Sequence, residues 1–136
     1  MLTISNGNGV GVGDGTGNFN HGTITLTNST VSGNITIVVA GFAHGGGGIY
    51  NGSGKVTINR STISNNGSSY YGGGIWNNGS AAVLALTGRT VSGNITGGYR
   101  GGGIVNVAGQ TTLTNSTVIG NKSTNPRHES GLVLVS

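Results

Sequence analysis

The sequence Gly46-Gly47-Gly48-Ile49-Tyr50-Asn51 follows a hexapeptide pattern, Gly-Gly-Gly-Ile-x-Asn, that recurs at Gly72–Asn77 and is matched again at Gly101–Asn106. A second pattern, Ser29-Thr30-Val31-Ser32-Gly33-Asn34, recurs in close variants that start at positions 61, 89 and 116, so the periods are 32, 28 and 27 residues. Repeats of roughly 20–50 residues are typical of solenoids, in which each repeat forms one unit of a stack. The chain is therefore expected to be a repeat protein.

Apolar and small polar residues alternate between these two patterns, at Thr23–Thr27, Lys55–Asn59, Val83–Thr87 and Gln110–Thr114. Alternation with a period of two residues indicates a strand that is buried on one face. Strands of successive repeats can pair at a spacing of about 4.8 Å and form a continuous core. The side chains expected in this core form four columns: Ile24, Val56, Leu84 and Thr111; Leu26, Ile58, Leu86 and Leu113; Val31, Ile63, Val91 and Val118; and Ile49, Ile75 and Ile104.

These patterns predict an all-β fold, a right-handed parallel β-helix (solenoid) of about four rungs. A rung is one circuit of the chain, and each is expected to hold three short strands. The 30 glycines argue against helices, because glycine in a helix costs about 1 kcal/mol relative to alanine. We divide the chain into an N-terminal partial or capping rung at residues 1–22, β-helix repeats at residues 23–121, and a C-terminal loop and last strand at residues 122–136.

Asparagine recurs at the end of the second pattern, as Asn34, Asn66, Asn94 and Asn121. Stacked rungs would bring these side chains into one column at a corner of the solenoid. Each side-chain amide has donors and an acceptor, so it can bond groups of the adjacent rung that the strands leave open. We therefore expect an internal asparagine ladder.

The hexapeptide copies and the segment Thr57–Asn66 resemble the repeats of right-handed parallel β-helix proteins of the bacterial surface or secreted type, such as adhesins and polymorphic outer-membrane proteins. The resemblance covers about Thr23 to Asn121, although the Phe-x-x-Asn element of the polymorphic outer-membrane type does not occur. Proteins of this group include adhesins, autotransporter passengers and polysaccharide-active enzymes. The resemblance implies the fold and an extracellular or cell-surface location, and it leaves the activity open.

Several aromatic residues share columns next to the hexapeptides. His44, Tyr70 and Tyr99 each lie two residues before a Gly-Gly-Gly run. Tyr50 and Trp76 follow isoleucines of the expected core, so they are expected to face outward and be exposed. Exposed rings on a β surface can stack on the C–H faces of sugars. The candidate glycan-binding residues are His44, Tyr50, Tyr70, Trp76, Tyr99 and Arg100.

Two other interpretations of the outer surface stay open. Aromatic columns also form because cross-strand aromatic pairs stabilise a sheet by about 0.2–1 kcal/mol. Two outward columns rich in threonine resemble the ice-binding face of β-solenoid antifreeze proteins, although threonine is also common on strands in general. These columns are Thr25, Thr57, Ala85 and Thr112, and Thr27, Asn59, Thr87 and Thr114.

Residues suited to catalysis or to metal binding are scarce. Asp14 and Glu129 are the only acids and lie near opposite ends of the chain, whereas glycoside hydrolysis uses two carboxylates about 5–10 Å apart. Arg60 and Arg89 could approach each other as a lyase would require, but no acidic cluster accompanies them. The histidines lack metal-ligand spacing, and the chain has no cysteine. We therefore name no catalytic residue, metal ligand or cofactor.

Charge and hydropathy limit the expected partners. The net charge of +4 comes from six scattered lysines and arginines, whereas nucleic acid requires a concentrated basic face. No apolar run approaches the roughly 20 residues that span a membrane, and no signal peptide is visible after Met1. Unpaired strand edges recruit other strands, so we expect end-to-end or edge self-association.

Together these observations predict a non-catalytic structural or adhesive module of a bacterial surface or secreted protein. The first alternative is a small carbohydrate-active β-helix that binds an extended polysaccharide, or cleaves it as a lyase or hydrolase. The two differ in one respect, since an enzyme needs a cleft with converging polar groups and a module needs only a regular wall. An ice-binding solenoid is the second alternative.

Overall fold

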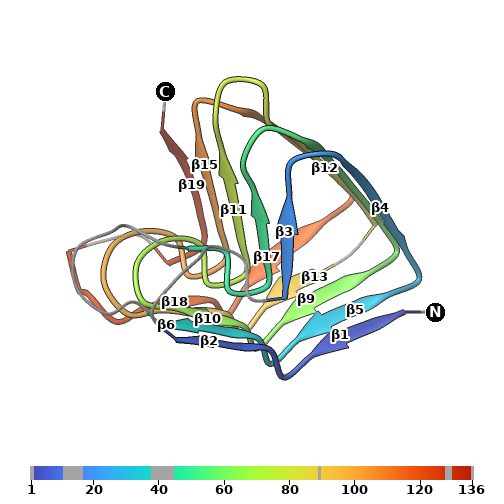
Figure 1. Cartoon of the computed structure of the whole chain (residues 1–136). Coiled ribbons are helices and arrows are strands. Elements are labelled where there is room, and N and C mark those ends of the chain that lie inside the picture. Colours follow the sequence, from blue (N-terminus) through green and yellow to red (C-terminus); the bar gives the residue numbers. More distant parts are fainter. Residues whose placement is uncertain (1, 11–16, 38–44, 89, 128–129, 136) are drawn as a thin grey trace.

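The computed structural model describes residues 2–10, 17–37, 45–88, 90–127 and 130–135. These residues form 19 short strands and no helix, and the strands wind into a parallel β-solenoid of about four rungs (Figure 1). The all-β solenoid expected from the repeats is confirmed. Within the described ranges, no helix offers the length and apolar character that a membrane span requires.

The strands form four sheets, named A to D here in the order in which the chain enters them. Sheet A contains β1 (Thr3–Ser5), β5 (Thr30–Ser32), β9 (Thr62–Ser64), β13 (Thr90–Ser92) and β17 (Thr117–Ile119). Sheet B contains β2 (Asn8–Val10), β6 (Ile35–Ile37), β10 (Gly67–Ser68), β14 (Ile95–Thr96) and β18 (Lys122–Ser123). Sheet C contains β3 (Asn18–Asn20), β7 (Ile49–Asn51), β11 (Ile75–Asn78), β15 (Ile104–Val107) and β19 (Leu132–Val135). Sheet D contains β4 (Thr23–Thr27), β8 (Lys55–Asn59), β12 (Val83–Thr87) and β16 (Gln110–Thr114).

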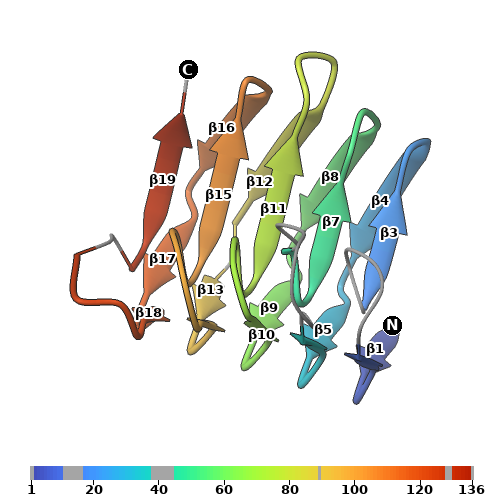
Figure 2. The same ribbon diagram turned by 60° about the vertical axis from the view of Figure 1, so that its left-hand side comes forward.

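Each strand pairs in parallel with its counterpart one rung away, so the rungs follow one another along the solenoid axis (Figure 2). The segments outside residues 23–121 take part in the same pairing. Near the N-terminus Ile4 pairs with Val31, and near the C-terminus Leu132 pairs with Ile104. Both segments therefore contribute strands to the sheets.

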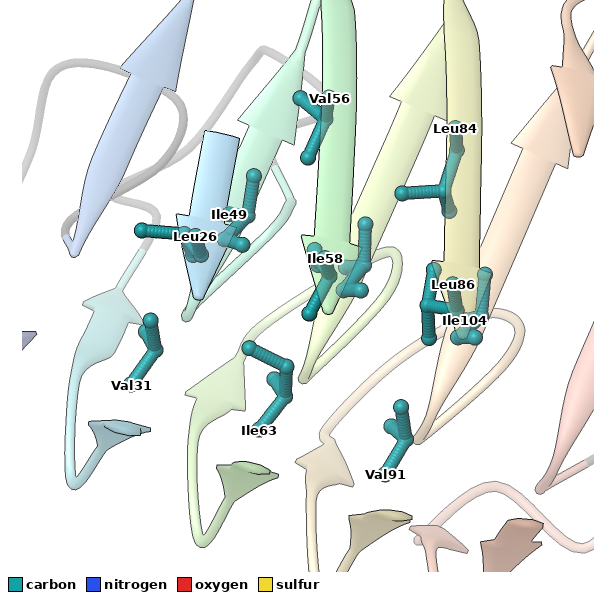
Figure 3. Packing of buried hydrophobic residues seen from close by; sticks show 11 residues of the cluster. Leu26, Val31, Ile49, Val56, Ile58, Ile63, Leu84, Leu86, Val91 and Ile104 are labelled. Carbon is teal, nitrogen blue, oxygen red and sulfur yellow. The ribbon is translucent and has the colours of Figure 1, made fainter. Parts of the chain in front are cut away.

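The strand register confirms the four predicted core columns. In sheet D, for example, Val56 lies between Ile24 and Leu84. The middle members of the columns are buried, and Figure 3 shows their side chains gathered in the space between the sheets. Ile24 and Leu113, in the outermost strands of sheet D, are only half-buried. Stacking of rungs, rather than the fold of one rung, therefore creates the core.

The expectation of three strands per rung is wrong, because sheet B supplies a fourth strand. Sheet B reverses the usual pattern, with exposed Ile35 and Ile95 on its outer side and hydroxyl side chains on its inner side. The inner residues, all buried, are Thr36, Ser68, Thr96 and Ser123. Inner hydroxyls bond the backbone of loops that lead to sheet C. Ser68 Oγ, for example, donates to the carbonyl oxygen of Tyr71 at 2.7 Å. A search for inward apolar residues overlooks such a sheet.

Two asparagine ladders run along the solenoid. The predicted ladder lies between sheets A and B and comprises Asn34, Asn66, Asn94 and Asn121. Each Nδ2 in it donates to the Oδ1 of the next member, at 3.0, 3.0 and 2.9 Å. A second ladder, missed by the sequence analysis, lies along sheet C with corresponding distances of 2.8, 2.7 and 2.6 Å. Its members are Asn20, Asn51, Asn77 and Asn106, three of which end the hexapeptide copies.

The triple glycines meet a steric requirement of the corner between sheets B and C. Gly47 and Gly73 pass so close to sheet B that an added Cβ would collide with the carbonyl oxygens of Gly67 and Ile95, respectively. Gly46 has a φ of 65°, a conformation that glycine adopts without steric cost. Close backbone packing therefore explains why this pattern recurs.

Candidate functional site

The outer side of sheet C carries a second apolar cluster, which includes two of the predicted site residues. Tyr50 and Trp76 share one column, as expected, but their predicted exposure is wrong, because only 8% of Tyr50 and 7% of Trp76 is accessible. The loops that follow β10 and β14 extend outward on this side of the solenoid (Figure 1). The cluster comprises Tyr50, Trp76, Val105 and Val133, with Tyr71 and Val107 packed against it.

Trp76 is held mainly by packing. The ring of Tyr71 stacks on it, with centroids 5.2 Å apart and planes 29° apart. On the preceding rung, a Cβ added to Gly45 would lie 2.8 Å from Cε3 of Trp76. The indole Nε1 is buried and has no hydrogen-bond partner within the described part of the chain. Trp76 therefore belongs to an outer core rather than to a sugar platform.

Tyr70 and Tyr99 form a stacked pair in neighbouring loops between sheets B and C. Their ring centroids are 4.8 Å apart with 17° between the planes, and the N–H of Tyr99 donates to the carbonyl oxygen of Tyr70 at 3.0 Å. Their predicted common column is confirmed. Tyr99 keeps 44% of its surface exposed, Tyr70 is half-buried, and Arg100 is exposed. His44, the third member expected in this column, lies outside the described residues.

A series of ring contacts connects the buried aromatic residues with the exposed ones. Phe19 stacks on Tyr50 with centroids 5.0 Å apart, and Tyr50 meets Trp76 edge-on at 5.1 Å. Beyond Trp76, Tyr71 lies 5.8 Å from Tyr99. Phe19, which is 55% exposed, and Tyr99 are thus the accessible ends of the series.

Phe19 and Tyr71 were not among the predicted site residues. Phe19 pairs with Tyr50 through β3, and the hexapeptide alignment does not extend that far toward the N-terminus. Tyr71 immediately follows Tyr70 and precedes the triple glycine. Its position in the sequence was therefore enough to predict that it lies near the aromatic columns.

Outward hydroxyl groups form columns on sheets A and D. On sheet D the two predicted columns are in register, with Ala85 and Asn59 interrupting them. Sheet A adds an uninterrupted column that the sequence analysis missed, since three-residue strands are too short to show alternation. This column is Thr3, Thr30, Thr62, Thr90 and Thr117.

A shallow hollow of about 430 Å³ lies on the outer side of sheet B. Gly67 lies between Ile35 and Ile95 in the register, so the missing side chain leaves a gap between two exposed apolar ones. Its described lining residues include no charged side chain. The hollow therefore lacks the convergent ionisable groups of an acid–base site.

The described residues bring few reactive groups together. His21 Nδ1 lies 3.0 Å from Ser53 Oγ in an exposed contact. Both acids of the chain, Asp14 and Glu129, lie outside the described residues, as does Arg89, so the approach of Arg89 to Arg60 stays a prediction. In the described part of the chain, no group of three or more His, Cys, Asp or Glu side chains is arranged to hold a metal ion.

The tyrosine pair with Arg100 is thus the part of the predicted site that the structure leaves accessible. Comparisons of the chain with protein-family models, with curated protein sequences and with solved structures found no match.

Proposed function

We propose that this chain is a non-catalytic structural or adhesive module of a bacterial protein that acts at the cell surface or outside the cell. The observation that supports the proposal is that the four sheets form a continuous wall around the core. The core columns and both asparagine ladders continue from rung to rung, so the buried amides hold the stack together. A module with a supporting or adhesive role needs only such a wall.

The adhesive contact is assigned to a tyrosine patch, defined as Tyr70, Tyr99 and Arg100. A sugar ring can stack on the exposed part of Tyr99, whose ring stacks on that of Tyr70 at a centroid distance of 4.8 Å. The Arg100 guanidinium and the tyrosine hydroxyls offer donors that can orient the sugar. Trp76 packs against Tyr71, the neighbour of Tyr70 in the chain, and Tyr50 packs against Trp76.

Binding to a glycan array tests this assignment. Tyr99→Ala is expected to weaken the binding of any recognised glycan at least tenfold, since one exposed ring supplies most of the stacking area. Phe19→Ala is the matched control, because it removes an exposed ring at the opposite end of the aromatic series. Incubation with the bound glycan should leave its chain length unchanged.

Two results would count against the assignment. If the chain binds no glycan, the adhesive role fails and the supporting role is the one left. If Phe19→Ala weakens binding as much as Tyr99→Ala, the loss reflects damage to the aromatic series rather than loss of a contact. A circular dichroism melt of each variant separates unfolding from loss of binding.

Ice binding is the second candidate function, and the complete threonine column of sheet A favours it. Five threonines recur once per rung without interruption, so their hydroxyl and methyl groups repeat at about 4.8 Å. A measurement of ice recrystallisation tests the idea. Thr62→Leu, in the middle of the column, should abolish any inhibition, whereas Thr27→Leu on sheet D should preserve it. Equal activity of the two variants would exclude sheet A as the ice-binding face.

A further inference from the structure

We propose that the tyrosine patch selects acidic glycans by means of two arginines, Arg100 and Arg127, on adjacent loops. This inference rests on the proposed glycan-binding function and adds the class of ligand, a polysaccharide whose sugars carry carboxylate or sulfate groups.

Hydrogen bonds hold the two loops that carry the arginines side by side. Asn125 Nδ2 donates to the carbonyl oxygen of Gly98 at 3.0 Å, and Thr124 Oγ1 donates to that of Gly97 at 2.7 Å. Arg100 follows Gly98 by two residues, and Arg127 follows Asn125 by two residues. In Figures 1 and 2 the loop after β18 lies next to the loop after β14. Arg100 directly follows Tyr99, and Arg127 lies on the adjacent loop, two residues after a position that is bonded to the loop of Tyr99.

The patch is accessible and positively charged. Arg100 and Arg127 are exposed, and exposed Lys122 lies on β18 in the same rung as Arg127. Glu129, the acid nearest to these cations in the sequence, follows Arg127 by two residues and lies outside the described ranges. Three of the six basic residues, Arg100, Lys122 and Arg127, thus lie in adjacent rungs toward the C-terminal end of the solenoid.

A uronic acid matches this arrangement in a single sugar unit. Its ring presents C–H groups that can stack on Tyr99, and its carboxylate projects from the ring edge, where a guanidinium can donate two parallel hydrogen bonds. Arginines on two adjacent loops can contact anions on neighbouring units of an extended chain. A neutral sugar could stack on the ring of Tyr99 but would offer no anion to the arginines.

The experiment compares one oligomer in two forms: an alginate oligomer, which is a chain of uronic acids, and the same oligomer with its carboxylates reduced to alcohols. Calorimetric titration gives the affinity of the unaltered chain and of Arg100→Gln and Arg127→Gln. Lys55→Gln is the matched control, because Lys55 is an exposed residue of β8 on sheet D and its replacement changes the net charge equally. Glu129→Gln removes the acid that follows Arg127 by two residues in the sequence.

We expect each arginine substitution to weaken binding of the acidic oligomer about tenfold, as loss of a charge-assisted contact does. Lys55→Gln should leave that affinity unchanged, and Glu129→Gln should leave it unchanged or raise it. The reduced oligomer should bind all variants equally and more weakly. Added salt should weaken only the acidic oligomer, because exposed charges are screened within about 10 Å at 0.1 M.

Each contrary result has a distinct meaning. Equal affinity for the acidic and reduced oligomers overturns the selectivity and leaves the glycan-binding proposal standing. Failure of both oligomers, together with a glycan array without hits, overturns both proposals. An equal loss with Lys55→Gln shows that net charge, not the patch, governs binding. Tighter arginine-dependent binding of a single-stranded DNA of equal charge would replace the glycan by a nucleic acid.

Discussion

Ile75 and Ile95 are the same residue type on neighbouring rungs, yet the solenoid uses them in opposite ways. Ile75 is completely buried between Ile49 and Ile104 in sheet C, whereas 46% of Ile95 is exposed on the outer side of sheet B. Burial of an aliphatic side chain contributes about 1.5–3 kcal/mol. The contribution of an isoleucine to stability therefore depends on the side of the wall on which it lies.

Truncation of these two side chains tests the register directly. Ile75→Ala should lower the free energy of unfolding by about 2–5 kcal/mol, because it leaves a cavity in a middle rung. Ile95→Ala should change it by no more than about 0.5 kcal/mol, as is usual for surface substitutions. Urea unfolding followed by circular dichroism measures both values, and similar losses for the two variants would contradict the assigned register.

Two glycines allow the effect of backbone conformation on stability to be measured separately from the effect of steric crowding. Gly120 and Gly131 both have open space where a Cβ would be added, but only Gly120 has a positive φ, of 63°. Gly120→Ala should therefore destabilise the chain by about 1–2 kcal/mol, the cost of the left-handed conformation for an L-residue.

Gly131→Ala is the matched control and should be neutral or stabilising by up to about 1 kcal/mol, because alanine loses less backbone freedom on folding. Thermal melting of the two variants measures the difference. A destabilisation of Gly131→Ala equal to that of Gly120→Ala would show that conformation is not the cause.

Among the elements, the asparagine ladders secure the ends of the short strands. In the first ladder Asn66 Nδ2 donates to the carbonyl oxygen of Val31 and to Asn94 Oδ1, both at 3.0 Å. Its own Oδ1 accepts bonds from the backbone N–H and from Nδ2 of Asn34, both at 3.0 Å. One side chain thus bonds both neighbouring rungs, in a site that is buried from solvent.

Asn66→Ala should lower the free energy of unfolding by at least about 2 kcal/mol, because it leaves several buried polar groups unpaired at about 1–3 kcal/mol each. Asn121→Ala, at the half-buried end of the same ladder, should cost less than half of that amount, since water can reach the groups it exposes. Equal effects in chemical unfolding would indicate that the ladder does not act through buried hydrogen bonds.

Across the whole molecule, stability depends on having a rung on both sides. Val56 and Leu84 in the middle of sheet D are fully buried, whereas Ile24 and Leu113 at its two ends are half-buried. In such a stack each rung contributes its own stability and that of its interfaces. The outer rungs have one interface each, and association of their open edges stays a prediction.

Amide hydrogen exchange should therefore be slowest in the middle rungs and faster toward both ends. Protection is expected to be highest in β8 and β12 and lowest in β4 and β16, because local opening of an outer rung breaks only one interface. Peptide-resolved mass spectrometry measures the profile. Uniform protection from β4 to β16 would instead show that the stack opens as a single unit.

The repeat pattern alone was sufficient to predict much of this structure. Alternation and a recurring period predicted the solenoid, the core columns and the ladder of Asn34, Asn66, Asn94 and Asn121, because a stack places equivalent residues above one another. The same logic correctly placed Tyr70 beside Tyr99. It failed for sheet B, where buried Ser68 and exposed Ile95 reverse the pattern on which strand recognition depends.

Only the tertiary structure decided which outward residues meet solvent. The local sequence around Trp76 indicates that its side chain leaves the core, but its burial depends on Tyr71 and the loop that carries it. Likewise, the loop that carries Arg127 lies against the loop that carries Arg100 because Asn125 bonds Gly98 across a rung. Periodicity specifies the wall, since each rung repeats the same local geometry, whereas the surface of the wall depends on loops that differ from rung to rung.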